Sequence, residues 1–338
     1  MHTRTISLAG RLASPRVAKR KASILIISLW TILILTTFAI ILGYGVRARV
    51  TLAVRLEQRD RARYLNQANI RMAIMKIKKQ GADSFVVLRG APWSYIYEQS
   101  EVELESNAGF IENQYAIFDE AGKININNAR SDVLERFFKL MFNLEEIEAQ
   151  ELAACIIDWR DKDSMYLLPV GSAEDSDYRN LRFSYEAKDE DFDCLAELLL
   201  VQGVTAEIFQ NLKDYLTIYG DGRVNINTAS QPVLLALGLS EYLVDNIIAF
   251  RDGKDKKEDT ADDVFFNSAS DISAQLGNFC VLSKFQQDEL DTISASHLTI
   301  GSDYFMIKSR IKFGKRQNRS QLTVIVNRAG NILSWEEF

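Results

Sequence analysis

A dense cluster of carboxylates lies between Cys155 and Asn180 and could bind a metal ion. The cluster consists of Asp158, Asp161, Asp163, Glu174, Asp175 and Asp177. Negative charges this close repel one another unless a cation neutralises them, and calcium suits them because it takes about six to eight oxygen ligands in flexible geometry. The glycine and the terminal glutamate of an EF-hand are not in register here, so the segment is not an EF-hand. The alternative is a solvated acidic loop with Arg160 and Arg179 as its local partners.

A second acidic segment runs from Asp252 to Asp263 and mixes six carboxylates with three lysines. Because charges of both signs are interspersed there, we expect a solvated loop rather than a metal site.

The three cysteines, Cys155, Cys194 and Cys280, form no CxxC motif. They are either buried apolar residues, or two of them form a disulfide in an oxidising compartment, and the sequence does not choose the pair.

The residues needed for common catalytic sites are missing from the sequence. His2 and His297 are its two histidines, so a Ser-His-Asp site would need His297, which begins an apparent strand. The motifs GxSxG, GxGxxG, HExxH and the P-loop do not occur. We therefore predict that the chain is not an enzyme. A membrane-tethered hydrolase with paired carboxylates is the alternative, because acids are abundant.

Two segments repeat across a shift of 100 residues. GKININNARSDVL runs from Gly122 to Leu134, and GRVNINTASQPVL runs from Gly222 to Leu234. Each copy predicts a short strand, a turn and a helix, with Asn127 and Asn227 as capping or turn residues.

The second copy is also similar to helix-hairpin-helix DNA-binding modules, which hold a phosphate with the backbone of a Gly-apolar-Gly hairpin. Leu237-Gly238-Leu239-Ser240 lacks the second glycine. Residues 1–79 hold sixteen of the 40 lysines and arginines but two of the 46 acids, so the remainder is strongly acidic and repels phosphate backbones. A membrane-anchored DNA-binding protein is therefore the alternative function, and nucleic acid is not the expected partner.

The N-terminal segment predicts a membrane-spanning helix. Residues 1–21 contain six lysines and arginines and no acid, and residues 22–46 contain no charge. About 25 apolar residues are enough to cross a bilayer. The basic leader is expected to stay in the cytoplasm, which places the rest of the chain across the membrane. Residues 47–79 lack proline and glycine and keep helical spacing of apolar residues, so the helix is expected to continue.

A basic leader, a small residue and an apolar helix that becomes amphipathic resemble the type IV pilin-like signal. The resemblance implies cleavage by a prepilin peptidase between Ala22 and Ser23, followed by methylation of the new N-terminus. Alanine replaces the usual glycine before the cut. Ile27 occupies the position of a glutamate that major subunits carry, and Trp30 matches an aromatic residue of K-type minor pseudopilins. Ile27 and Trp30 are the expected helix-packing residues of a filament.

The acidic cluster also resembles the K-type minor pseudopilins of type II secretion. The matching residues are Asp158-Trp159-Arg160-Asp161-Lys162-Asp163, Gly171-Ser172-Ala173-Glu174-Asp175 and Tyr178. The helical domain of that family binds calcium, and the resemblance implies the ligands Asp161, Asp163, Glu174 and Asp177.

The resemblance implies an assembly function. A K-type subunit sits at the tip of the pseudopilus, helps nucleate the filament and thereby supports protein export. The implied partners are the I-type and J-type minor pseudopilins, the major pseudopilin, the prepilin peptidase and the inner-membrane assembly platform. The implied location is the bacterial inner membrane, with a single pass, a cytoplasmic N-terminus and a periplasmic C-terminal domain.

The predicted architecture is an α+β, pilin-like fold: a long N-terminal helix packed on an antiparallel sheet, with a large inserted α-helical domain. Strands are expected at 85–88, 94–97, 115–126, 304–313, 321–328 and 332–335. The expected segments are a leader (1–22), the long helix (23–80), the first part of the sheet (81–128), the helical insertion (129–295) and the second part of the sheet (296–338).

Overall fold

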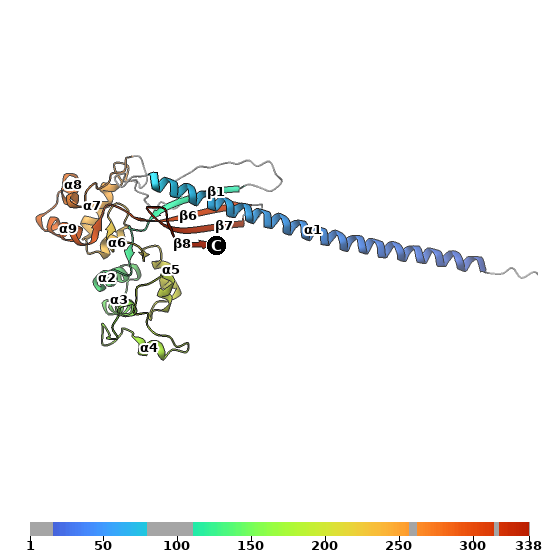
Figure 1. Cartoon of the computed structure of the whole chain (residues 1–338), viewed down its shortest axis with the longest axis horizontal. Coiled ribbons are helices and arrows are strands. Elements are labelled where there is room, and N and C mark those ends of the chain that lie inside the picture. Colours follow the sequence, from blue (N-terminus) through green and yellow to red (C-terminus); the bar gives the residue numbers. More distant parts are fainter. Residues whose placement is uncertain (1–15, 80–110, 257–261, 314–317, 338) are drawn as a thin grey trace, which may run out of the picture. The chain divides into compact units, whose positions relative to one another are not determined.

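The computed structural model describes residues 16–79, 111–256, 262–313 and 318–337 (Figure 1). The chain divides into two compact units, Met1–Arg61 and Ala62–Phe338. The strands predicted at 85–88 and 94–97 lie outside the described residues, as does most of the predicted leader.

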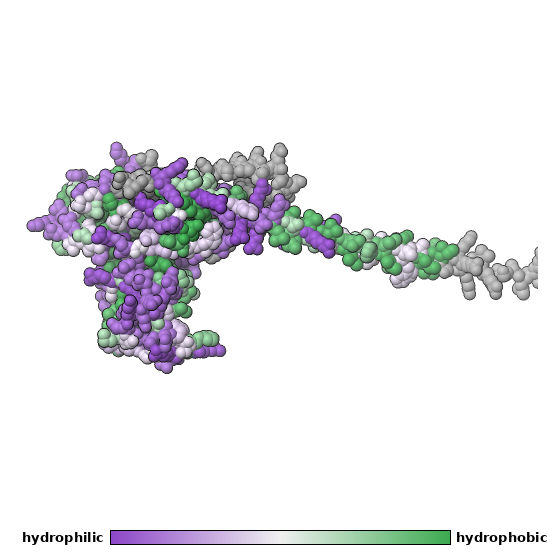
Figure 2. All heavy atoms as spheres, in the orientation of Figure 1, coloured by the Kyte–Doolittle hydropathy of each residue, from purple (hydrophilic) through white to green (hydrophobic). Residues whose placement is uncertain are grey.

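Helix α1 is continuous from Arg16 to Lys79, which confirms the long helix expected from the sequence. In the first unit, residues 24–46 are uncharged and exposed, and an 18-residue window has a mean hydropathy of 2.6. Figure 2 shows apolar surface along this part of the helix. At about 1.5 Å per residue, such a segment is about 35 Å long and spans the apolar core of a bilayer. The helix therefore fits a single-pass membrane anchor.

The second unit contains a four-stranded antiparallel sheet. Its strands are β1 (Ile111–Asp119), β6 (Tyr304–Phe313), β7 (Asn318–Asn327) and β8 (Ile332–Glu337), in the order β1-β6-β7-β8. Side chains alternate between the two faces of a strand, so cross-strand partners share a face. Ile117 pairs with Ile307 and Ile307 with Val324, and all three are buried.

The last part of α1 packs on this apolar face of the sheet. Ile70, Ala73 and Ile77 recur at helical spacing and are at most 2% exposed. They form one buried cluster with the side chains of Tyr115, Ile117, Phe305, Ile307, Leu322, Val324 and Val326. Helix and sheet therefore share a core, as in the predicted pilin-like fold.

Two buried asparagines interrupt this apolar contact. Ser309 donates a hydrogen bond to Asn66 Oδ1 at 2.6 Å, and Asn69 Nδ2 donates to Ser309 Oγ at 2.8 Å. Asn66 also donates to Ser320 Oγ, and Asn69 donates to Asn113 Oδ1. Buried amides without partners are costly, so these bonds specify one register of α1 on the sheet.

The helical domain is inserted between β1 and β6. Its helices are α2 (Ser131–Phe142), α3 (Glu146–Arg160), α4 (Asp175–Arg179), α5 (Ala206–Leu212), α6 (Gln231–Ala236), α7 (Glu241–Arg251), α8 (Ile272–Phe279) and α9 (Lys284–His297). Two 3-10 helices, η1 (Leu195–Leu200) and η2 (Ala269–Asp271), lie among them. Short parallel pairs join β2 (Ile124–Asn125) to β3 (Leu216–Thr217) and β4 (Val224–Asn225) to β5 (Leu298–Thr299).

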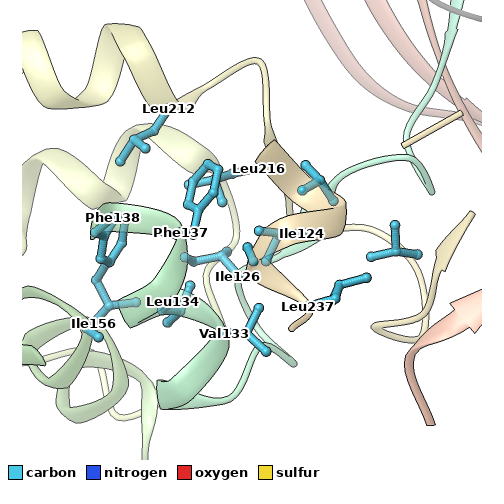
Figure 3. Close-up of a cluster of buried hydrophobic side chains, with 14 of the residues drawn as sticks. Ile124, Ile126, Val133, Leu134, Phe137, Phe138, Ile156, Leu212, Leu216 and Leu237 are labelled. Atoms are coloured by element: carbon cyan, nitrogen blue, oxygen red, sulfur yellow. The ribbon is translucent and has the colours of Figure 1, made fainter. Parts of the chain in front are cut away.

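The core of the insertion is continuous across the two repeat copies. Figure 3 shows Val133 of α2 near Leu237, just after α6, and Phe138 of α2 near Ile156 of α3 on the other side of the cluster; Leu134 and Phe137 lie between them. All of these side chains are buried in one cluster that also includes residues of α7. Neither copy buries its apolar face alone, so each stabilises the other.

The two repeat copies have the same local structure. The backbone N–H of Asn127 donates to Asn125 Oδ1, and that of Asn227 donates to Asn225 Oδ1. These turns follow β2 and β4, as predicted. The prediction that Asn127 and Asn227 cap the following helices is wrong, because the N-cap positions belong to Arg130 and Ser230.

The side chains of Asn127 and Asn227 instead bind distant backbone. Asn127 accepts from the N–H of Phe192 at 2.8 Å and donates to its carbonyl at 3.1 Å. Asn227 makes the same pair of bonds with Phe266, at 2.8 and 3.1 Å. One amide therefore satisfies two backbone groups in each copy, which a cap does not do.

The two copies contact each other at equivalent positions. A Cβ on Gly122 would lie 2.7 Å from Thr228 Oγ1, and a Cβ on Gly222 would lie 2.6 Å from Asn128 Cβ. Gly122 and Gly222 differ by the repeat shift, as do Asn128 and Thr228. The two copies therefore pack against each other closely at equivalent positions.

Some predicted elements differ from the structure. The expected strand 115–126 is divided by a turn, in which the N–H of Ala121 donates to Asp119 Oδ1. Within the helical insertion, residues 195–200 form the 3-10 helix η1 rather than an α-helix.

Candidate cation site

The end of α3 positions the first part of the acidic cluster. Arg160 is the last residue of this helix and donates a hydrogen bond to the carbonyl of Ala129. The N–H of Asp161 donates to the carbonyl of Ile157 at 3.0 Å. Asp161 therefore lies at a helix C-terminus, where the helix dipole disfavours a negative charge.

The start of α4 positions the second part. Glu174 is the N-cap residue of this short helix. The ring of Tyr178 in α4 packs edge-on against Trp159 of α3, with centroids 5.2 Å apart, and stacks on Tyr185 at 5.3 Å. This aromatic cluster fixes α4 beside the end of α3, so Glu174 meets Asp161 although they are far apart in sequence.

Three of the four predicted ligands come together. One carboxylate oxygen each from Asp161, Asp163 and Glu174 lies within 4.8 Å of the other two. Glu174 is 2% exposed, Asp161 is half-buried and Asp163 is exposed. Asp163 is therefore the member of the group that solvent reaches.

The buried oxygens of this group lack partners. Neither carboxylate oxygen of Glu174 has a hydrogen-bond partner of normal geometry among the described residues, and the same holds for Asp161 Oδ1. Removing a carboxylate from water without compensation is expensive. The geometry is therefore incomplete without a proton or a cation.

The pKa values of these carboxyls also indicate that their ionised forms are unfavourable. Burial, followed by the negative charges of Asp158 and Asp161, raises the pKa of Glu174 to about 7. Burial, followed by the charges of Asp163 and Asp158, raises the pKa of Asp161 to about 6. A bound cation favours the ionised forms and would lower both values.

Asp177, the fourth predicted ligand, lies beside the group but is already hydrogen-bonded. Its Oδ2 accepts from the N–H of Glu174 at 3.0 Å and from the hydroxyl of Tyr166 at 2.9 Å. Asp158 is fully buried and accepts from the N–H of Leu167. Both acids therefore hold the loop in place.

Asp189 is a neighbour that the sequence analysis missed. Its N–H donates to the carbonyl of Trp159 at 3.1 Å, which brings it to the end of α3. Its backbone is left-handed, with φ of 55°, and its Oδ1 has no partner among the described residues. Its charge raises the pKa values of Asp161 and Glu174. The left-handed aspartate, unusual outside turns, is visible only in the structure.

The donor set is chemically uniform. Carboxylate oxygens suit hard cations such as calcium and magnesium, whereas zinc prefers thiolate and imidazole. The nearby thiol of Cys155 donates to the carbonyl of Gly171, and burial raises its pKa to about 12, so it stays protonated. The residues present fit a calcium-type site.

A match to a known family begins at the first residue of the first repeat copy. Residues 122–221, which include the whole carboxylate group, match the family model of type II secretion system protein K. The match covers less than a third of the chain. The chain is similar to type II secretion system protein K of Pseudomonas aeruginosa, at 27% identity over 60% of this chain and 57% of the relative. It is also similar to that of Aeromonas hydrophila, at 34% identity over 30% of each chain.

A solved structure shares the fold of the larger part of the chain. It is the GspK-GspI-GspJ complex of the enterotoxigenic Escherichia coli type 2 secretion system, with a TM-score of 0.58 and 15% identity. The match covers 83% of this chain and 97% of that one. The pilin-like fold with an inserted helical domain is thereby confirmed. The sequence alignments span about half or less of the lengths of the two curated relatives.

The hairpin between α6 and α7 is unlike a phosphate site. Gly238 makes the turn with φ of 98°, as in a helix-hairpin-helix module. The N–H of Ser240, however, donates to the carboxylate of Glu289 at 2.6 Å. A carboxylate on the hairpin amide competes with a phosphate and repels it. The comparisons give the DNA-binding alternative no support.

The predicted processing and packing residues lie in α1. Ala22 and Ser23 are helical, and the helix continues through them. Ile27 and Trp30 are 60% and 59% exposed. Their exposure leaves them available to lipid or to other helices.

Proposed function

We propose that the chain is a minor pseudopilin at the tip of the type II secretion pseudopilus, where it helps nucleate the filament and supports export. The main observation is the combination of an exposed apolar helix with a pilin-like sheet that carries a large insertion between β1 and β6. Helices of this kind can pack in a membrane or in a filament core. The bulk of the insertion leaves little room for a further subunit above it, and this role requires no catalysis.

The proposed partners are the I-type and J-type minor pseudopilins. The similar structure is described as a complex of GspK with GspI and GspJ, and this chain shares the fold of the matched chain. The major pseudopilin, the prepilin peptidase and the assembly platform of the inner membrane complete the proposed set. We place the leader in the cytoplasm and the second unit in the periplasm, with cleavage between Ala22 and Ser23 followed by methylation.

The proposed cofactor is calcium, held by Asp161, Asp163 and Glu174, with Asp177 as an additional predicted ligand. The two oxygens of buried Glu174, which have no hydrogen-bond partner of normal geometry among the described residues, support this assignment more strongly than the number of acids does. Calcium would neutralise the group and join the end of α3 to the start of α4.

The function is tested by coexpression of the full chain with the I-type and J-type subunits and the prepilin peptidase of the same organism. We expect a stable ternary complex, a mature N-terminus at Ser23, and loss of secretion in a strain that lacks the chain. Retention of full secretion in that strain, or the absence of any complex, would refute the assignment.

Calcium binding is tested by isothermal titration calorimetry of the full-length protein near pH 7.5. Glu174→Gln and Asp163→Asn are expected to weaken binding about tenfold or more, since each removes a charged ligand. Glu190→Gln is the matched control, because Glu190 is an exposed acid outside the group. Equal affinities in Glu174→Gln and Glu190→Gln would show that the group is not the site.

A further inference from the structure

Three arginines follow the apolar segment of α1 and form what we call the arginine collar: Arg47, Arg49 and Arg55. Arg47 comes directly after the uncharged residues 24–46, and all three side chains are exposed on a continuous helix. At about 1.5 Å per residue, the collar extends about 12 Å beyond the apolar segment. At about 100° per residue, its side chains leave the helix in three directions.

The side chains of the collar lean toward the apolar segment. In an α-helix the Cα–Cβ bonds tilt toward the N-terminus, and here the apolar segment lies on that side. The long stems of arginine let the guanidinium groups reach a membrane surface. Tyr44, which is 69% exposed, lies just before the collar. Tyrosine concentrates at the membrane interface, so Tyr44 marks the same level.

The collar is not neutralised by its own helix. Within the described part of the chain, no ion pair is formed by its three arginines. The first acid after the apolar segment is Glu57, two positions from Arg55, a spacing that does not bring side chains together. Farther along, Arg61 has Glu57 four residues before it, and Arg63 lies 3.7 Å from Glu337.

We propose that the arginine collar binds the anionic headgroups of phospholipids, such as phosphatidylglycerol, in the leaflet at the C-terminal end of the apolar segment. Guanidinium groups form paired hydrogen bonds with phosphate oxygens. The proposal goes beyond the filament function, because it requires only the membrane anchor. It also means that a helix leaving the bilayer for a filament must exchange headgroup contacts for contacts with other subunits.

The test uses the full chain in detergent micelles with mixed phospholipids, and native mass spectrometry counts the lipids retained. We expect phosphatidylglycerol to be retained in preference to phosphatidylcholine. The variant R47Q/R49Q/R55Q should lose this preference by about fivefold for each arginine removed. The control R59Q/R61Q/R71Q removes the same charge from the same helix, farther from the apolar segment, and should keep it.

A charge-preserving variant distinguishes a loss of lipid binding from a loss of folding. R47K/R49K/R55K should retain most of the preference, since lysine also binds phosphate. Equal retention of both lipids by the unmodified chain would overturn the proposal, and so would equal losses in the two glutamine variants. If R47Q/R49Q/R55Q instead keeps its lipid and loses a copurifying pseudopilin, the collar binds carboxylates of another subunit and the lipid proposal is wrong.

Discussion

The two repeat copies share the same local structure and differ in the acidic segment that follows it. In the first copy, Arg160 at the end of α3 donates to the carbonyl of Ala129, and in the second, Arg251 at the end of α7 donates to that of Ala229. Acids come after both arginines. After the first, Asp161 and Asp163 converge with Glu174, and Asp161 Oδ1 and both Glu174 oxygens lack a hydrogen-bond partner of normal geometry among the described residues. After the second, Asp262 accepts from the backbone N–H groups of Lys254 and Asp255.

The difference shows what distinguishes a site from an acidic loop. Both segments have six carboxylates, so their number does not separate them. Buried oxygens without a donor are described in the first segment, while Asp262 of the second accepts from two donors. An unsatisfied buried charge requires a partner from outside the chain, and a satisfied one does not.

The largest expected effect on the free energy of unfolding comes from removing an asparagine whose hydrogen bonds both copies share. Asn227→Ala removes two hydrogen bonds and leaves the N–H and carbonyl of Phe266 buried without partners. We expect a loss of about 3 kcal/mol in the free energy of unfolding, and about 2 kcal/mol for Asn127→Ala, because Asn127 is less buried. Urea denaturation measures both. A smaller loss for Asn227→Ala than for Asn127→Ala would contradict the comparison.

The contact between the copies is tested by a pair of glycines. Gly222 and Gly220 both have left-handed backbones, with φ of 89° and 99°. A Cβ on Gly222 meets Asn128, whereas a Cβ on Gly220 meets nothing within 4 Å. Gly220→Ala should cost about 1 kcal/mol from backbone strain, and Gly222→Ala about 2 kcal/mol more. Equal losses in thermal unfolding would show that the copies are not packed as described.

The unsatisfied site of the first copy predicts a pH dependence. Without a cation, folded Glu174 keeps its proton up to about pH 7, whereas the unfolded chain ionises near its usual value of 4.5. The folded state then binds more protons in this window, so stability falls as pH rises from about 4.5 to about 7.

The expected size of this loss is about 2 kcal/mol in a chelator, and Glu174→Gln should remove most of it. Saturating calcium should also reduce the slope, since it favours the ionised carboxylate. Urea midpoints measured across this pH range provide the readout. The same slope in Glu174→Gln and in the unmodified chain would exclude Glu174 as its origin.

The smallest effect is expected in the second copy. Asp252→Asn alters the acid directly after Arg251, at the position that Asp161 holds after Arg160. Because the second copy has no proposed calcium site, the calcium-induced rise in melting temperature should stay within about 1 °C of the unmodified value. Differential scanning fluorimetry with and without calcium measures this. A clear reduction would place a cation in the second copy as well.

The sequence predicted the parts that depend on local pattern. The uncharged stretch and the helical spacing after it predicted α1, and alternation predicted β6 and β7. The carboxylate spacing and the family resemblance together predicted four ligands, of which Asp161, Asp163 and Glu174 come together while Asp177 does not join them. Whether they bind calcium remains a prediction.

The parts that were missed depend on contacts between distant segments. Asp189 reaches the site through a backbone bond to Trp159, and Asn127 and Asn227 bind backbone far along the chain. No local pattern reports such bonds. Asp252 was expected in a solvated loop, yet it is 8% exposed. The mixed charges around it describe the segment as a whole and not the position of one residue.

The buried bonds between α1 and the sheet have a mechanical consequence. Sliding α1 by one helical turn, about 5.4 Å, would separate Asn66 and Asn69 from Ser309 at the same moment. A purely apolar contact would resist such sliding weakly, because one row of apolar side chains can take the place of the next. An axial load on residues 62–79 of α1 is therefore transmitted to β6 through these hydrogen bonds.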